Sequence, residues 1–294
     1  MTNKSIREES YYKNFQKYLK EDDEILGSTD VVPLSKIDKD AAQAAISGGT
    51  RDGSKPDDAI AGKKISISVN KLKAAQTEII PEKALGLAFG MLKSGKIGGD
   101  LGSIISKDNF IMDGHHRWAG TFLCDPNGQV QATQIDLPGT ALVTALNLIT
   151  VGKFGKSGNP GKGNIADFKG SVIGPIIDKL LLEGIKGEYP QSSEEVKTNL
   201  GKVPGADGDA NKGKEIMMQN ADALPKEIMP DAPPRVEMPV IGTKEVAIVQ
   251  KFLEKGIVDL KPPYSPEVKK ALGMESKKRL DDILKESIDK SKLK

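Results

Sequence analysis

The first regular element that the apolar pattern predicts in the core of the protein is a strand near residue 65. Ile65, Ile67 and Val69 alternate with polar residues, which is the period of a half-buried strand. A helix follows from Pro81, because proline fits the first turn of a helix, where its missing N–H costs nothing. We expect this helix to end at Ser94-Gly95. Its apolar residues fall on one face, and they are Ala84, Leu85, Ala88, Met91 and Leu92.

Five further elements complete a predicted core over residues 64–151. Residues 103–106 and 109–112 are predicted to be short strands, joined by a hairpin turn at Lys107-Asp108. The pattern then predicts, in order, a helix over about 116–123, a strand over 130–135 and a helix over 140–150. Strands and helices are mixed throughout this segment, so we expect an α/β (α+β) fold with one small core.

Residues 1–63 are predicted to be an irregular N-terminal arm, with turn-forming residues throughout 47–56. The exception is a short amphipathic helix, whose apolar residues recur at helical spacing: Tyr11, Tyr12, Phe15, Tyr18 and Leu19. The simpler interpretation is that this helix docks on the protein's own core. The alternative is that it binds a partner protein.

Downstream of the core, residues 152–170 are rich in Gly, Lys and Ser, which is typical of a linker. Residues 171–294 are predicted to form a helical, loop-rich C-terminal region that can also contact protein partners. This region is expected to contain amphipathic helices over 172–185 and 246–253, an extended Pro-rich stretch over 222–239 and a charged helix over 275–294.

Composition narrows the class of protein. The 294 residues carry a net charge of +2, so the chain as a whole is not a basic nucleic-acid wrapper, and any nucleic-acid surface would be local. The single cysteine, Cys124, excludes an intramolecular disulfide and fits a reducing compartment. No run approaches the roughly 20 apolar residues of a membrane helix, and the N-terminus has no apolar signal core. We therefore expect a cytoplasmic protein without a membrane partner.

The strongest chemical signal lies between the strand at 109–112 and the helix that follows it. Asp113 and Gly114 allow a sharp turn, because glycine tolerates backbone angles that other residues resist. The first N–H groups of the next helix have no internal partner, and the helix dipole adds positive charge there, which favours a phosphate. Arg117 can grip two phosphate oxygens through its planar guanidinium. His115 and His116, the only histidines in the chain, add donors whose charge could change near neutral pH.

Two alternatives compete with a phosphate site. Asp113 could simply cap the helix while Arg117 pairs with a surface carboxylate, and the spacing alone fits this interpretation equally well. A metal site is not expected, because the adjacent His115 and His116 diverge at a helix start and no third histidine or cysteine pair completes a zinc site.

The same residues resemble the ParB/sulfiredoxin superfamily, which includes ParB-like nuclease domains. The box Asp113-Gly114-His115-His116-Arg117 is similar to the Gly-Glu-Arg-Arg box of ParB proteins and the Gly-Cys-His-Arg box of sulfiredoxins. Residues 69–72 resemble the family's first strand, and residues 87–95 resemble its Leu/Ala-rich helix that ends in glycine. The resemblance covers residues 64–151, less than a third of the chain.

The resemblance implies a small fold that binds the phosphates of ATP or another nucleotide, with or without magnesium. It implies that Gly114, His116 and Arg117 contact phosphates beside Asp113. His115 stands where sulfiredoxins have their reactive cysteine and where ParB proteins have glutamate, so neither sulfinate repair nor ParB-like CTP switching is expected. His115, His116 and Glu78 are the candidate catalytic residues. Glu78 would act as a general base, and a solvated loop glutamate is the simpler alternative.

Three functions follow as hypotheses. The first is a nucleotide-dependent phosphohydrolase, kinase or nuclease that acts at the turn over 113–117. The second is a structural or interaction protein, such as a virion assembly component of a phage, that uses the core as a scaffold and would be virion-associated. The third, a DNA-partitioning adaptor, is the weakest, because the sequence contains no convincing helix-turn-helix, although a nucleic-acid partner stays open.

Overall fold

The structure is a computed structural model that describes residues 31–48, 58–186, 190–261 and 264–274. The helix expected around residues 11–19 and the charged helix expected over 275–294 lie outside the described residues. Within these ranges the chain mixes helices with one sheet, so the predicted α/β (α+β) class is confirmed.

The sheet has five strands in the order β1-β5-β3-β4-β2. Its strands are β1 (Gly62–Ser68), β2 (Lys73–Ala74), β3 (Gly99–Ser106), β4 (Phe110–Ile111) and β5 (Gln129–Ile135). β1 runs antiparallel to β5, with Ile65 opposite Ala132, and β5 runs parallel to β3. β3 and β4 form the predicted hairpin, and β4 runs parallel to the short edge strand β2. The sheet therefore brings the end of β4 beside the chain that leaves β2.

Two helices of the predicted core pack against each other at one side of the sheet. Helix α3 (Pro81–Ser94) has the predicted bounds, and Gly95 ends it in the left-handed conformation with φ of 68°. Helix α4 (His115–Cys124) starts directly after the turn at Asp113 and Gly114. Trp118 on α4 is fully buried, and its Nε1 donates a hydrogen bond of 2.8 Å to the carbonyl oxygen of Val69. This bond fixes α4 to the end of β1.

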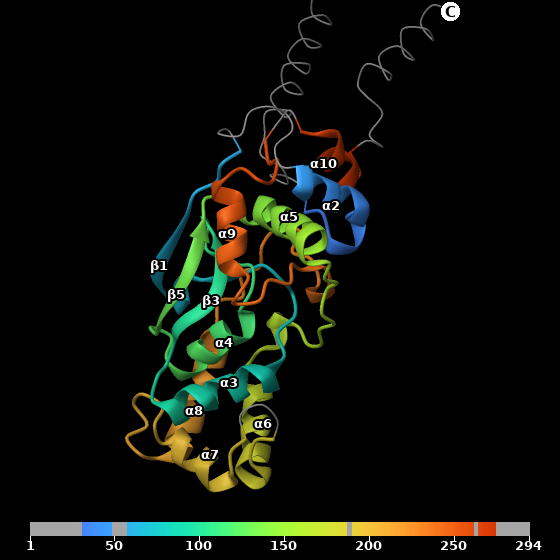
Figure 1. The fold of residues 1–294 in the computed structure, drawn as a ribbon. Helices are drawn as coiled ribbons and strands as arrows, with labels where there is room; N and C mark the ends of the chain where they lie inside the picture. The colour runs from blue at the N-terminus through green and yellow to red at the C-terminus, as the bar shows by residue number, and fades with distance from the viewer. Residues whose placement is uncertain (1–30, 49–57, 187–189, 262–263, 275–294) are drawn as a thin grey trace, which may run out of the picture.

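Helices cover both ends of the sheet, and most of them come from outside the predicted core (Figure 1). One apolar cluster includes α2 (Lys39–Gly48), α5 (Gly139–Ile149), α9 (Val246–Glu254) and α10 (Pro266–Ala271). A second cluster joins α3 and α4 to α6 (Gly170–Glu183), α7 (Ser193–Leu200) and α8 (Ala210–Ala223). The helices expected over 172–185 and 246–253 are therefore present, whereas α7, α8 and α10 were not predicted.

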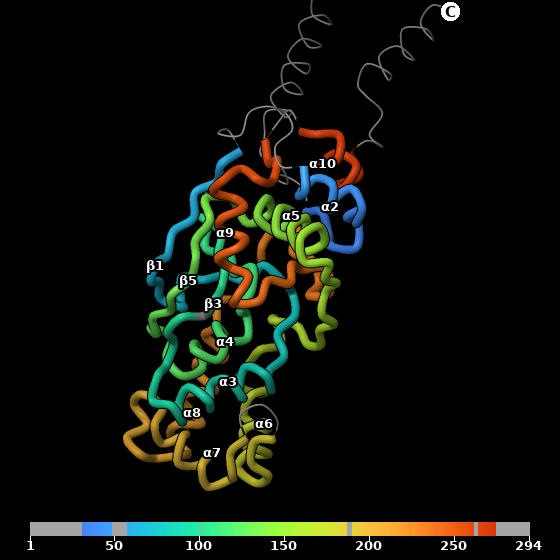
Figure 2. The backbone as a smooth tube through the Cα atoms, viewed as in Figure 1, coloured from blue at the N-terminus to red at the C-terminus, as the bar shows by residue number. Residues whose placement is uncertain are grey.

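Parts of the expected arm and linker are ordered components of the fold. Residues 39–48 were expected to be irregular and instead form α2, because Ala41, Ala42 and Ala45 present a narrow apolar stripe that is fully packed. Figure 2 shows α2 beside α10, where the N–H of Asp38 donates to the carbonyl oxygen of Ala271. After α5 the chain makes a π-helical turn over Thr150–Phe154 and then crosses the molecule without regular structure until 164.

The segment over residues 155–164 packs against other parts of the protein. A Cβ atom on Gly158 would collide with the carbonyl oxygen of Val236, so the two backbones touch. The N–H of Ile165 also donates to the carbonyl oxygen of Thr77 at 2.8 Å. Within the described ranges, no helix is both long enough and apolar enough to cross a membrane.

Candidate functional site at the N-terminus of helix α4

The predicted strand-turn-helix is present at residues 110–117. Gly114 adopts φ of 96°, which a residue with a side chain rarely accepts, and it directly precedes the first residue of α4. A Cβ atom at this position would also collide with the Oγ of Ser103 on β3. Glycine is therefore required here both by the backbone angle and by the close approach of the neighbouring strand.

The two histidines are buried and act as hydrogen-bond acceptors. His115 is 3% exposed, and its Nε2 accepts from the backbone N–H of Ala75 at 3.1 Å. His116 is 7% exposed, and its Nε2 accepts from the backbone N–H of Ile80 at 3.1 Å. An accepting Nε2 carries no proton, so each neutral ring holds its proton on Nδ1. Together the two rings hold the chain of residues 75–80 against the start of α4.

The expectation that the histidines change charge near neutral pH is wrong. Burial, together with the neighbouring His116 and Arg235, lowers the pKa of His115 to about 3. Burial also lowers the pKa of His116 to about 3, with added repulsion from Lys83 and Arg235. Imidazoles of this kind stay neutral at physiological pH, so they are poor general acids there. Their geometry suits positioning better than proton transfer.

Asp113 places a half-buried carboxyl beside the same turn. Burial raises the pKa of Asp113 above its usual range, although the N–H of Gly114 and the charges of Arg117, Lys83 and Arg235 act in the opposite direction. Asp113 is not the capping residue of α4, because the N-cap position of the helix is Gly114. The capping alternative for this residue is therefore wrong.

Three cations, Arg117, Lys83 and Arg235, lie close enough to the start of α4 for their charges to act on Asp113. Within the described part of the chain, the side chains of Arg117 and Lys83 form no hydrogen bond and no ion pair, so the alternative in which Arg117 pairs with a surface carboxylate finds no partner there. Arg235 comes from a distant segment, and its guanidinium donates to the carbonyl oxygen of Pro160 at 2.7 Å. Positive charge thus gathers where the helix dipole is also positive.

Glu78 is held by the protein rather than by solvent. Its Oε2 accepts from the Oγ1 of Thr77 at 2.9 Å and from the backbone N–H of Arg235 at 2.6 Å. The side chain of Glu78 therefore fastens the segment that carries Arg235 to the loop after β2. Glu78 is a half-exposed loop residue that is also bonded to the protein, and its role as a general base stays a prediction.

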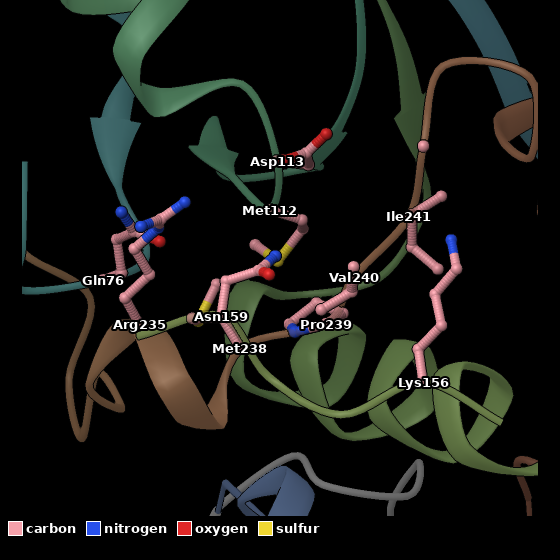
Figure 3. A pocket seen from close by; sticks show the side chains of 11 residues that line it. Gln76, Met112, Asp113, Lys156, Asn159, Arg235, Met238, Pro239, Val240 and Ile241 are labelled. Atoms are coloured by element: carbon pink, nitrogen blue, oxygen red, sulfur yellow. The ribbon is translucent and has the colours of Figure 1, made fainter. Parts of the chain in front are cut away.

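A cavity of about 200 Å³ lies beside the turn (Figure 3). Gln76 and Arg235 lie at one end of it and Lys156 at the other. The remaining lining residues are Met112, Asp113, Asn159, Met238, Pro239, Val240, Ile241 and Gly242. Most of these wall residues lie outside the predicted core, and no local sequence pattern connects them to the site.

One sequence signal could have found Arg235. The described ranges contain two arginines, Arg117 and Arg235, in a chain that otherwise uses lysine for positive charge there. Both arginines lie at the same site.

For metal binding, no group of three or more His, Cys, Asp or Glu side chains in the described ranges is arranged to hold an ion.

No protein-family model, curated protein or solved structure matches this chain. The resemblance to the ParB/sulfiredoxin superfamily therefore stays a prediction. The chemistry of the site has to be inferred from its own charges, burial and hydrogen bonds.

Proposed function

We propose that this protein binds the phosphates of a nucleotide at the N-terminal turn of α4, as a nucleotide-dependent phosphohydrolase, kinase or nuclease. The observation that carries the proposal is the set of three cations, Lys83, Arg117 and Arg235, whose charges all act on Asp113 beside an uncapped helix start. Such a helix start favours an anion through its free N–H groups and its dipole. A phosphate would supply the negative charge that this group of cations lacks.

Each residue of the site has a role in the proposal. Arg117, in the first turn, suits a two-point grip on phosphate oxygens, while Lys83 and Arg235 add positive charge to the site. His116 keeps its Nδ1 proton as a neutral donor, since its Nε2 is engaged with Ile80. Asp113 directly precedes Gly114, the N-cap residue of α4. Its raised pKa reduces the repulsion that a charged carboxylate would exert on an arriving phosphate.

The proposed ligand is ATP or another nucleotide, with or without magnesium. The test is a calorimetric titration of the full chain with ATP, ADP and CTP, each with and without magnesium. Arg117→Ala should weaken binding by about ten-fold or more, because it removes a charged hydrogen-bond donor. Arg117→Lys keeps the charge but loses the planar guanidinium, so its affinity for nucleotide should lie between those of the wild type and Arg117→Ala. Lys179→Ala, at an exposed lysine on α6, is the matched control and should bind as the wild type does.

A wild-type protein that binds none of these nucleotides would overturn the proposal. Where binding is present, product analysis with water, free serine or plasmid DNA as the acceptor distinguishes the hydrolase, kinase and nuclease reactions. The Glu78→Gln variant then tests the general base. Loss of a base would lower turnover without weakening nucleotide binding, whereas a purely structural Glu78 would alter stability instead.

A structural or interaction protein is the second candidate, and one observation favours it. The Nε2 atoms of both histidines accept hydrogen bonds from the backbone N–H groups of residues 75 and 80, so these side chains hold the fold together. A fold can persist after its chemistry is lost. This candidate predicts that the wild type binds no nucleotide and that Arg117→Ala changes neither stability nor assembly with a partner.

A further inference from the structure

The cavity beside the turn has two kinds of wall. One is apolar and comes mainly from a segment far along the chain: Met112, Met238, Pro239, Val240 and Ile241. The other carries two carboxamides, Gln76 and Asn159, which come from two different loops. A cavity with apolar faces and a few polar groups at its edge is the usual form of a small-molecule site.

The carboxamides at the polar edge of the cavity have hydrogen-bonding groups that the protein does not use. The side chain of Asn159 is exposed and makes no hydrogen bond with any described residue, so its donor and its acceptor are both available. Gln76 uses its Nε2 on the carbonyl oxygen of Glu78 at 2.5 Å. A carboxamide can pair with a ring edge that presents a donor next to an acceptor.

The apolar faces suit a flat ring. Met112 and Met238 are each 2% exposed, and thioether sulfur makes favourable contacts with aromatic rings. The guanidinium of Arg235 is planar, and it can stack on a ring while it donates to Pro160. The cavity's volume of about 200 Å³ is smaller than the roughly 300 Å³ at which pockets for drug-sized ligands begin, so it fits one ring system rather than a whole nucleotide.

Charge argues against a second anion in this cavity. Lys156 lies at one end, but its Nζ is already paired with Glu245, at 2.7 Å from Oε1. Asp113 adds a carboxyl to the lining. The free positive charge lies instead at the start of α4. Asp113 and Arg235 belong to both places, so a ligand could place its anionic part at the helix and its ring in the cavity.

We propose that this cavity is a nucleobase pocket, in which Asn159 and Gln76 contact the edge of the base and residues 238–241 cover its face. The inference rests on the proposed phosphate site, and it assigns the base to a wall built from segments outside residues 64–151. The base of a bound nucleotide would thus be selected by the loop at 155–163 and by the chain at 235–242.

The experiment compares nucleotides with a ligand that has phosphates but no base. Dissociation constants for ATP, GTP, CTP, UTP and inorganic tripolyphosphate are measured by calorimetry for the full chain. Three variants are compared with the wild type. Asn159→Ala removes the edge contact, Val240→Trp fills the cavity, and Ile248→Trp places the same ring at an exposed position of α9 as the control.

The expected result is that the wild type binds at least one nucleotide more tightly than tripolyphosphate. Asn159→Ala should reduce the preference among bases by roughly ten-fold, the range of one paired base contact. Val240→Trp should bring all four nucleotides to the affinity of tripolyphosphate, while Ile248→Trp leaves every affinity unchanged. Circular dichroism and thermal unfolding of each variant confirm that the fold is retained.

Two outcomes overturn the base pocket while the phosphate site survives. One is equal affinity of the wild type for tripolyphosphate and all nucleotides. The other is a Val240→Trp protein that is folded and still prefers the same nucleotide by the same factor. Failure of the phosphate site looks different, because neither tripolyphosphate nor any nucleotide would then bind.

Discussion

The Nε2 of His116 accepts a hydrogen bond from the backbone N–H of Ile80, the residue that immediately precedes α3. His116 lies in the first turn of α4, so this one bond ties the starts of two helices together. His115 makes the parallel bond to Ala75 at the end of β2. The loop between β2 and α3 is therefore held at both ends by adjacent residues of one helical turn.

Replacing His116 by alanine should lower the free energy of unfolding by about 1–3 kcal/mol, because the N–H of Ile80 is left without its acceptor. His116→Gln places an amide oxygen near the position of Nε2 and should recover part of the loss. Urea unfolding followed by the emission of Trp118, the chain's single tryptophan and a fully buried one, measures both variants. Equal stability of the alanine variant and the wild type would show that the bond has no structural weight.

Stability should fall as the pH is lowered below about 6.5. The pKa values of His115 and His116 are lowered to about 3 in the folded protein, so the unfolded chain binds more protons between pH 3 and pH 6.5. The free energy of unfolding should therefore decrease toward low pH, by up to about 1.4 kcal/mol per pH unit for each histidine. At pH values above the pKa of histidine in the unfolded chain, these two histidines do not change the stability with pH.

Asp113 opposes this slope at the acidic end. Its raised pKa means that the folded protein takes up a proton more readily than the unfolded chain just above the usual carboxyl range. Asp113→Asn should remove that opposition and steepen the acid destabilisation, while His116→Gln should make it shallower. Urea unfolding at a series of pH values between about 8 and 4 separates the three proteins. A flat profile for the wild type would mean that the histidines are charged in the fold.

Gly114→Ala should destabilise the protein by about 2 kcal/mol or more, because the residue has φ of 96° and a Cβ atom would collide with the Oγ of Ser103. Gly86→Ala is the matched control. Gly86 lies inside α3, and a Cβ atom added there would meet nothing within 4 Å, so alanine should stabilise the helix by roughly 0.5–1 kcal/mol. Relative to the wild type, the midpoint temperature of thermal unfolding should therefore fall for Gly114→Ala and rise for Gly86→Ala.

Local chemistry explains which parts of the fold the sequence could predict. The ends of α3 follow from Pro81 and Gly95, whose backbone preferences need no knowledge of the rest of the molecule. The turn at Gly114 follows in the same way. Helix α2 escaped prediction because its apolar stripe is made of small alanines, which carry a weak hydrophobic signal until a partner such as α10 covers them.

Long-range contacts explain what could not be predicted at the site. The bond between Glu78 and the N–H of Arg235 joins residues 157 positions apart, and no local pattern marks such a pairing. The neutral state of the histidines likewise depends on burial by segments from across the chain. Residue types at 113–117 therefore indicated a site, whereas its charge state and its cavity wall depended on tertiary packing.

Asn147 should control how firmly the cavity wall is held. It is fully buried on α5, and its Nδ2 donates at 3.0 Å to the carbonyl oxygens of both Val32 and Glu237. Asn147→Ala leaves these two carbonyls without that donor, so it should cost about 2–3 kcal/mol of stability. The segment at 235–242 should also open more often, and hydrogen exchange at the N–H of Val240, which donates to Thr150, reports that opening.

The control for this prediction is Asn70→Ala. Asn70 is exposed and its Nδ2 donates to the side chain of Asn127, so its loss should change stability by no more than about 0.5 kcal/mol. If the N–H of Val240 exchanges as slowly in the Asn147→Ala variant as in the Asn70→Ala variant, the cavity wall is held by its apolar contacts instead. In the expected case, faster exchange at Val240 should be accompanied by weaker nucleotide binding, because the same segment carries Arg235 and the proposed cover of the base.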